Sequence, residues 1–175
     1  EDVRMPVSSA KTVSVMPSTL SVKPLSQIDA TKEQRFVTGI NELDRVLGGG
    51  IVKGSGVLLS GDPGIGKSTI LLQICNALQN HLNILYVSGE ESAIQIKMRA
   101  NRLGVESDNV TVMTETDSQI VNNYILSSKP QIVMIDSIQT MNLEAVNSSS
   151  GSITQVRECT SMLLRVAKNL DIPII

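Results

Sequence analysis

Nine consecutive residues combine glycines, a lysine and hydroxyl side chains at a spacing suited to phosphate binding. In order they are Gly61, Asp62, Pro63, Gly64, Ile65, Gly66, Lys67, Ser68 and Thr69. The glycines let consecutive N–H groups turn toward phosphate oxygens, because a Cβ would exclude the backbone conformations required. In a G-x-x-x-x-G-K-S loop the lysine reaches the β- and γ-phosphates and assists catalysis, and the serine hydroxyl coordinates Mg²⁺. All nine residues are therefore predicted to bind a nucleoside triphosphate.

An aspartate follows a strongly apolar run later in the chain. Residues 132–135 are Ile, Val, Met and Ile, and Asp136 comes next. A buried strand would deliver this carboxylate to the edge of a sheet, where it can hold Mg²⁺ through water or beside Ser68. The alternative is an aspartate that caps a turn or helix. The distance from the glycine-rich loop favours the metal-binding role.

Two acids, Glu90 and Glu91, follow the apolar run 83–88 and Gly89. An acid at the end of a strand near the γ-phosphate can orient and deprotonate an attacking water. The alternative is that both acids stabilise the start of the next helix through its dipole. Glu90 suits the catalytic base, whereas Glu91 suits the helix terminus.

Other polar residues carry weaker signals. Arg99 and Arg102 lie in the helix expected after Glu91. One alternative is that they bind adenine or phosphate, and the other is that they form a solvated helix face. The loop 147–152 is either a mobile DNA-facing loop or a plain linker, and both alternatives stay open. His81 is expected at the surface beside a helix terminus.

The elements that must position these residues alternate between strands and helices. Parallel strands covered by helices on both faces bind ligands at their carboxyl ends, and the loop 61–69, Glu90 and Asp136 all fall at such ends. The predicted strands are a buried 57–60, then 83–88, 109–114, 132–136 and 172–175. The predicted helices are 67–79, 92–103, 117–127 and 153–170. The last has an apolar face of Ile153, Val156, Leu163, Val166, Ala167 and Leu170.

Composition sets broader limits. Aromatic residues make up only 2%, so aliphatic side chains must form the core, and a net charge of −2 gives no sign of a strongly basic nucleic-acid surface. The two cysteines, Cys75 and Cys159, are expected to be free, buried thiols in a reducing compartment. No secretion signal or membrane span is evident, which favours a cytoplasmic protein.

The chain divides into two parts of different character. Residues 1–34 are rich in Ser, Val, Thr and Pro without a regular period, which is typical of a linker or docking arm. Residues 35–175 carry the α/β alternation. Because the sequence stops on an apolar strand, this domain is expected to be truncated.

Five motifs together resemble the RadA (Sms) family of bacterial DNA-repair proteins over residues 35–175. They are TGINELDRVLGGG at 38–50, GDPGIGKST at 61–69, SGEES at 88–92, IDSIQT at 135–140 and GSITQVREC at 151–159. The first motif is shared more loosely with KaiC-like ATPases, where its glycines form turns before the phosphate-binding strand.

The resemblance implies a RecA-like P-loop ATPase core that uses ATP with Mg²⁺. It implies, for the complete protein, a homo-hexamer that drives branch migration on single-stranded DNA, with no membrane partner. Glu90 then corresponds to the catalytic glutamate and Arg99 falls where adenine is often stacked. The family's four-cysteine zinc module, sensor segment and Lon-like domain are absent from this sequence, so no zinc site is expected. Two alternatives remain: a KaiC-like regulatory ATPase without a DNA track, and a nucleotide-binding module that is catalytically silent alone.

Overall fold

The computed structural model describes residues 24–27 and 33–175, which fall in two units, 1–32 and 33–175. In the first unit the described residues form a short 3₁₀ helix, η1 (Leu25–Gln27). Most of the linker predicted for residues 1–34 lies outside the described residues.

Three parallel strands form the central sheet of the second unit. They are β3 (Ile84–Ser88), β4 (Val110–Thr114) and β5 (Ile132–Asp136), in the spatial order β4-β3-β5. Ser88, the last residue of β3, pairs with Thr114 on one side and with Asp136 on the other. The three strands therefore end together, and the residues that follow them meet at one edge of the sheet.

The strands predicted at 57–60 and 172–175 are reduced to isolated bridges. Ile174 bridges Val133 on one side and Gly56 on the other, and Val57 N donates to Ile174 O at 2.8 Å. Residues 58–60 make no backbone hydrogen bond within the described chain, and Leu58 is 80% exposed. The prediction of a buried strand at 57–60 is therefore wrong. In this parallel register Val57 lies opposite Ile175.

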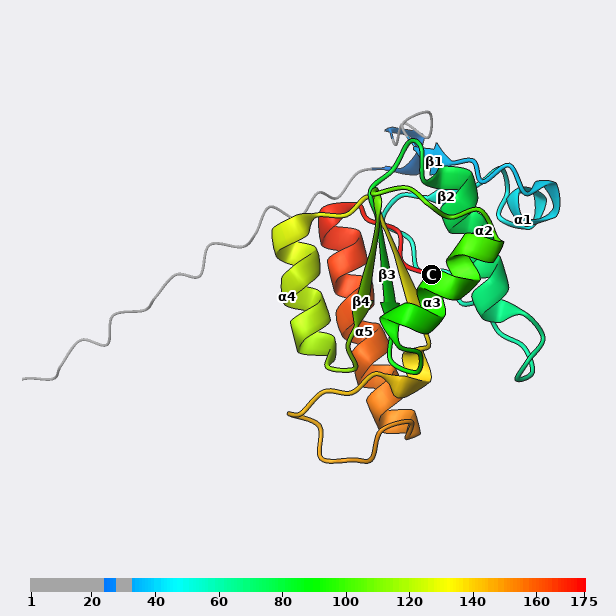
Figure 1. Cartoon of the computed structure of the whole chain (residues 1–175). Helices are drawn as coiled ribbons and strands as arrows, with labels where there is room; N and C mark the ends of the chain where they lie inside the picture. Colours follow the sequence, from blue (N-terminus) through cyan, green and yellow to red (C-terminus); the bar gives the residue numbers. More distant parts are fainter. Residues whose placement is uncertain (1–23, 28–32) are drawn as a thin grey trace, which may run out of the picture. The chain divides into compact units, whose positions relative to one another are not determined.

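Four helices cover the sheet, two on each face (Figure 1). The helices α2 (Lys67–Leu78) and α3 (Ala93–Arg102) lie on one face, and α4 (Ser118–Ser128) and α5 (Ile153–Leu170) lie on the other. The mixed α/β class and the parallel sheet with helices on both faces, predicted from the sequence, are confirmed.

Short polar side chains fix where three of these helices begin. Ser92, Asp117 and Ser152 are the N-caps, and each side chain accepts a hydrogen bond from a backbone N–H of the first turn. At Ser92 the bond is reciprocal, because the Gln95 side chain accepts from Ser92 N at 2.9 Å. Such a capping box satisfies two otherwise unpaired N–H groups and sets the start of α3 directly after Glu91.

The core has two halves because neighbouring strand residues point to opposite faces. In β3, Ile84 and Tyr86 pack against α2 and α3, whereas Leu85 and Val87 pack against α4 and α5. Both cysteines are free and buried, as predicted. Ile153 departs from the prediction for α5: it is 89% exposed, because the first turn of that helix extends past the ends of the strands (Figure 1).

A small antiparallel ribbon precedes the phosphate-binding loop. The strands β1 (Arg35–Phe36) and β2 (Ile51–Val52) pair with each other, and α1 (Asn41–Val46) lies between them in the sequence. Gly50 has a φ of +125°, and a Cβ there would lie 2.6 Å from Phe36 O. This glycine therefore serves the turn into β2, as the structural interpretation of the motif at 38–50 predicted. In the described part of the chain, no helix has the length and apolar composition needed to cross a membrane.

Candidate active site

The glycine-rich loop takes a backbone shape that side chains would hinder. Gly64 and Gly66 have φ values of +79° and +107°, and Gly66 is the left-handed N-cap of α2. Ile70 N donates to Gly66 O at 3.0 Å, which closes the first turn of the helix. The loop therefore leads directly into a helix N-terminus, whose unpaired N–H groups and dipole favour a bound anion.

Lys67 is folded back over its own loop. Its Nζ donates to Gly61 O at 2.7 Å and to Asp62 O at 2.9 Å. The ammonium group is thereby held among backbone carbonyls at the mouth of the loop, within reach of any anion that this loop binds. A triphosphate would exchange these neutral acceptors for charged ones, which form stronger hydrogen bonds.

The remaining loop residues are accessible to a ligand. Residues 61–65 are exposed, and Ile65 retains 68% of its surface. Ser68 and Thr69 lie in the first turn of α2 and are partly buried.

Asp136 ends β5 and is held by a tyrosine from the neighbouring strand. The Tyr86 hydroxyl donates to Asp136 Oδ2 at 2.6 Å. Tyr86 is 1% exposed, and its burial together with this hydrogen bond raises its pKa above the usual value, so the hydroxyl is a proton donor at neutral pH. Among the described residues, none donates a hydrogen bond to Asp136 Oδ1.

Glu90 and Glu91 have different partners. Ser137 Oγ donates to Glu90 Oε1 at 3.0 Å, which joins Glu90 to the residue after Asp136. Glu91 instead forms an ion pair with Arg99, and both side chains are about one quarter to one third exposed (25% and 30%). Among the described residues, Glu90 therefore has no cationic partner, whereas Arg99 is paired with the Glu91 carboxylate.

Close packing at Gly89 fixes where Glu90 lies. A Cβ on Gly89 would lie 2.3 Å from Thr140 Oγ1 and 2.9 Å from Thr116 Cγ2. Thr140 belongs to η3 (Ile138–Thr140), and its hydroxyl donates to Ser137 O at 2.8 Å. The turns after β3 and β5 are thus in contact, which brings Glu90, Asp136 and Ser137 together.

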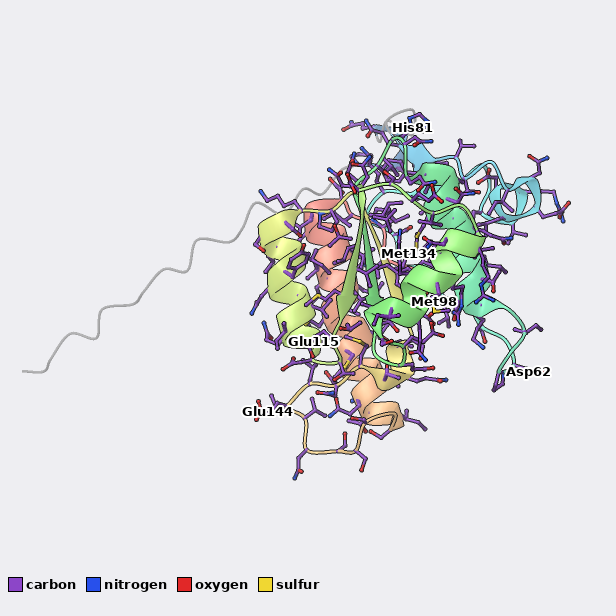
Figure 2. The ribbon with its side chains drawn as sticks, viewed as in Figure 1. Asp62, His81, Met98, Glu115, Met134 and Glu144 are labelled. Atoms are coloured by element: carbon purple, nitrogen blue, oxygen red, sulfur yellow. The ribbon has the colours of Figure 1, made fainter. Side chains whose placement is uncertain are left out.

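The phosphate loop and the carboxylates occupy the same end of the domain without direct contact. In Figure 2, Asp62 of the loop and Glu115, which follows β4, lie at the end opposite His81. Within residues 24–27 and 33–175, no hydrogen bond or ion pair joins a side chain of residues 61–69 to Asp136 or Glu90. His81 is exposed, as predicted.

The donor set fits Mg²⁺ brought by a nucleotide. The described residues contain no group of three or more His, Cys, Asp or Glu side chains that could hold a metal alone. Mg²⁺ usually keeps several waters and binds through one or two carboxylates plus substrate phosphates. Asp136 and the Ser68 hydroxyl would supply this minimal set, and a bound Mg²⁺ would offset the charge of the phosphates.

Two residues in this network escaped the sequence analysis. Tyr86 lies in an apolar strand, where a tyrosine is ordinarily interpreted as core. Ser137 follows Asp136 directly, and its position beside a candidate metal ligand is the signal that could have identified it.

The loop after β5 is attached to α5 by a buried glutamine. Gln155, which is 2% exposed, accepts from Leu143 N at 2.9 Å. Its amide nitrogen lies within 3.2 Å of Leu143 O and within 3.0 Å of Val146 O and Ser148 O. Of the loop 147–152, for which a mobile loop and a plain linker are both open, Ser148 is bonded to this glutamine, whereas Leu143 and Val146 precede the loop.

A phosphate-binding loop at the start of a helix, with strand-end carboxylates on a parallel sheet covered on both faces, defines a RecA-like P-loop ATPase domain. The sequence model of the KaiC ATPase family matches residues 36–116.

Several proteins named DNA repair protein RadA are similar in sequence to this chain. The one from Haemophilus influenzae is 49% identical over 154 residues, which are 88% of this chain and 34% of the relative. The Bacillus subtilis protein is 48% identical over 152 residues (86% and 33%), and the Escherichia coli protein is 46% identical over 154 residues (88% and 34%). The chain is therefore similar to RadA proteins over a RecA-like core, and the resemblance predicted from the motifs is confirmed. It spans about a third of the length of these relatives.

Proposed function

We propose that this chain binds ATP with Mg²⁺ and hydrolyses it, as the ATPase core of a DNA-repair protein. The observation that carries the proposal is at the strand ends, where the hydroxyl of Ser137, the residue after Asp136, donates a hydrogen bond to Glu90. The similarity to RadA proteins supports the repair role.

Each residue has a distinct task in this proposal. The backbone N–H groups of residues 61–69 bind the phosphates, and Lys67 transfers its hydrogen bonds from Gly61 O and Asp62 O to them. Ser68 and Asp136 hold the metal. Glu90 orients and deprotonates the attacking water through Oε2, while Ser137 holds Oε1. Arg99 lies beside the site, and stacking on adenine would require it to leave Glu91.

Paired substitutions test the catalytic assignment. Glu90→Gln should retain ATP binding while turnover falls by about 10²–10⁴-fold, the usual contribution of a general base. Glu144→Gln, an exposed glutamate beyond β5, is the matched control and should leave turnover unchanged. Lys67→Ala should abolish tight nucleotide binding. ATP turnover in Glu90→Gln close to that of the native protein would reassign the base.

A second experiment tests the role in DNA repair. We infer, from the resemblance of its motifs to the RadA family, that the complete protein forms a hexameric ring that drives branch migration on single-stranded DNA. The names of the RadA relatives support the DNA-repair role. Single-stranded DNA should then raise the ATP turnover of a full-length RadA-like protein that carries this core. Equal turnover with and without DNA would favour a KaiC-like regulatory ATPase, the alternative that the family match at residues 36–116 supports. If neither this chain nor the full-length protein hydrolysed the ATP that it binds, a silent nucleotide-binding module would be favoured.

A further inference from the structure

We propose that Tyr86 is a positioning residue that fixes the orientation of the Asp136 carboxylate for Mg²⁺–nucleotide binding. The inference deepens the proposed function and rests on it. Tyr86 does not contact the reacting atoms in this role, because it acts through Asp136.

The sheet register places the tyrosine and the aspartate on one face. Tyr86 pairs with Met134 of β5, and Asp136 lies two residues further along the same strand. Side chains two apart on a strand point to the same side, so Tyr86, Met134 and Asp136 share a face. Tyr86 and Met134 belong to the core cluster that α2 covers. The hydroxyl therefore approaches Asp136 from within the core, beneath the helix that carries Ser68.

The rigidity of Tyr86 makes this contact an orienting one. The whole of β3 is buried, and Tyr86 is 1% exposed. Its ring is confined by the core, so the hydroxyl that lies 2.6 Å from Asp136 Oδ2 has little freedom to move. A carboxylate at the end of a strand would otherwise rotate about its side-chain bonds. With Oδ2 bonded to Tyr86, Oδ1 has no hydrogen bond from a described residue and is available to the metal or its waters.

Hydrogen bonds of this kind matter measurably for metal binding. Removing a group that orients a metal ligand typically lowers metal affinity by about 10–100-fold. Because Asp136 is expected to contact Mg²⁺ at least partly through water, the lower end of this range applies. Tyr86→Phe should raise the Mg²⁺ concentration that half-saturates nucleotide binding by about tenfold.

The test is a Mg²⁺ titration of the binding of a fluorescent ATP analogue to the 175-residue chain. Tyr86→Phe keeps the ring that fills the core, and its unfolding temperature checks that the fold is intact. Tyr124→Phe is the matched control: Tyr124 lies on α4, beside a hollow of about 170 Å³ that contains none of the predicted site residues. This control should bind nucleotide with the native Mg²⁺ dependence. Nucleotide binding at saturating Mg²⁺ should be nearly equal in all three proteins.

A combined variant separates positioning from general loosening of the structure. In Asp136→Asn, the added change Tyr86→Phe should not alter the Mg²⁺ dependence further, because both changes disrupt one interaction. Native Mg²⁺ dependence in Tyr86→Phe, or a full additional tenfold loss in the combined variant, would overturn the positioning role. If the native chain bound nucleotide without any dependence on Mg²⁺, the proposed metal site itself would fail and the role of Tyr86 with it.

Discussion

Gln155 connects the loop after β5 to the body of the domain, and replacing it should loosen that loop. Gln155 is the third residue of α5, and it is buried in the helix face that also holds Cys159 and Leu163. A leucine there would keep most of the side-chain volume but none of the hydrogen bonds to residues 143–148. The perturbation is therefore Gln155→Leu.

The contacts set the size of the effect. From the loop, Oε1 accepts one hydrogen bond, and the two amide hydrogens can satisfy at most two of the three nearby carbonyls. Three hydrogen bonds at about 1 kcal/mol each give a loss of about 3 kcal/mol. Burying the more apolar leucine returns about 1 kcal/mol. The free energy of unfolding should fall by about 2 kcal/mol, which for a domain of this size lowers the unfolding temperature by about 4–8 °C.

Urea denaturation measures this loss, and amide hydrogen exchange locates it. The amides of residues 143–148 should exchange faster in Gln155→Leu than in the native protein. Gln119→Leu is the matched control, since Gln119 occupies the first turn of α4, where its side chain is exposed and bonds only Asn123 among the described residues. A Gln155→Leu protein within about 0.5 kcal/mol of the native stability would refute this account, because that is the range of neutral surface changes.

Two further predictions concern the core and the turn at Gly89. Burial raises the pKa of Cys75 from 9.0 to about 12, so the unfolded chain loses this proton before the folded chain does. The free energy of unfolding should therefore fall by about 1.4 kcal/mol per pH unit as pH rises above 9. Urea denaturation at pH 9 and at pH 10 should show a smaller fall in this free energy for Cys75→Ala than for the native protein. Gly89→Ala should destabilise by about 1–3 kcal/mol, because its Cβ would overlap Thr140 and Thr116. Native stability of this variant in urea would contradict the packing described.

Local patterns predicted the elements whose boundaries depend on their own residues. β5 (Ile132–Asp136) and α5 (Ile153–Leu170) have the predicted bounds, since an apolar run or a capping serine defines each end. The prediction for 57–60 failed because a strand also needs a paired neighbour, and an apolar run does not show which of its residues will be paired. Ile153 failed for a related reason: the helical period places it on the apolar face but does not show where the sheet beneath ends.

The candidate site likewise contains residues that local patterns predict and residues that they do not. The phosphate loop, Glu90 and Asp136 were predicted from spacing, and the structure brings Glu90 and Asp136 into one group through Ser137 and Gly89. The contact between Tyr86 and Asp136 joins residues 50 apart, and no local pattern encodes the register of two strands so far separated. Gln155 did leave a signal, because a polar side chain lies on the otherwise apolar stripe of α5. A buried polar residue on such a stripe needs partners, and those partners are the loop.

The register of β3 against β5 therefore governs the chemistry as well as the core. The face of β5 that carries Met134 toward α2 also carries Asp136, and Ser88 pairs with Asp136 so that the turns after both strands meet. Because strand side chains alternate, a slip of one residue would turn Met134 toward α4 and α5 and turn Asp136 to the opposite face. Both faces of β5 are closely packed, so the repacking of every buried side chain would oppose that slip. The apolar run before Asp136 thus does more than bury a strand: it fixes which way the carboxylate points, and the Tyr86 hydroxyl refines that direction.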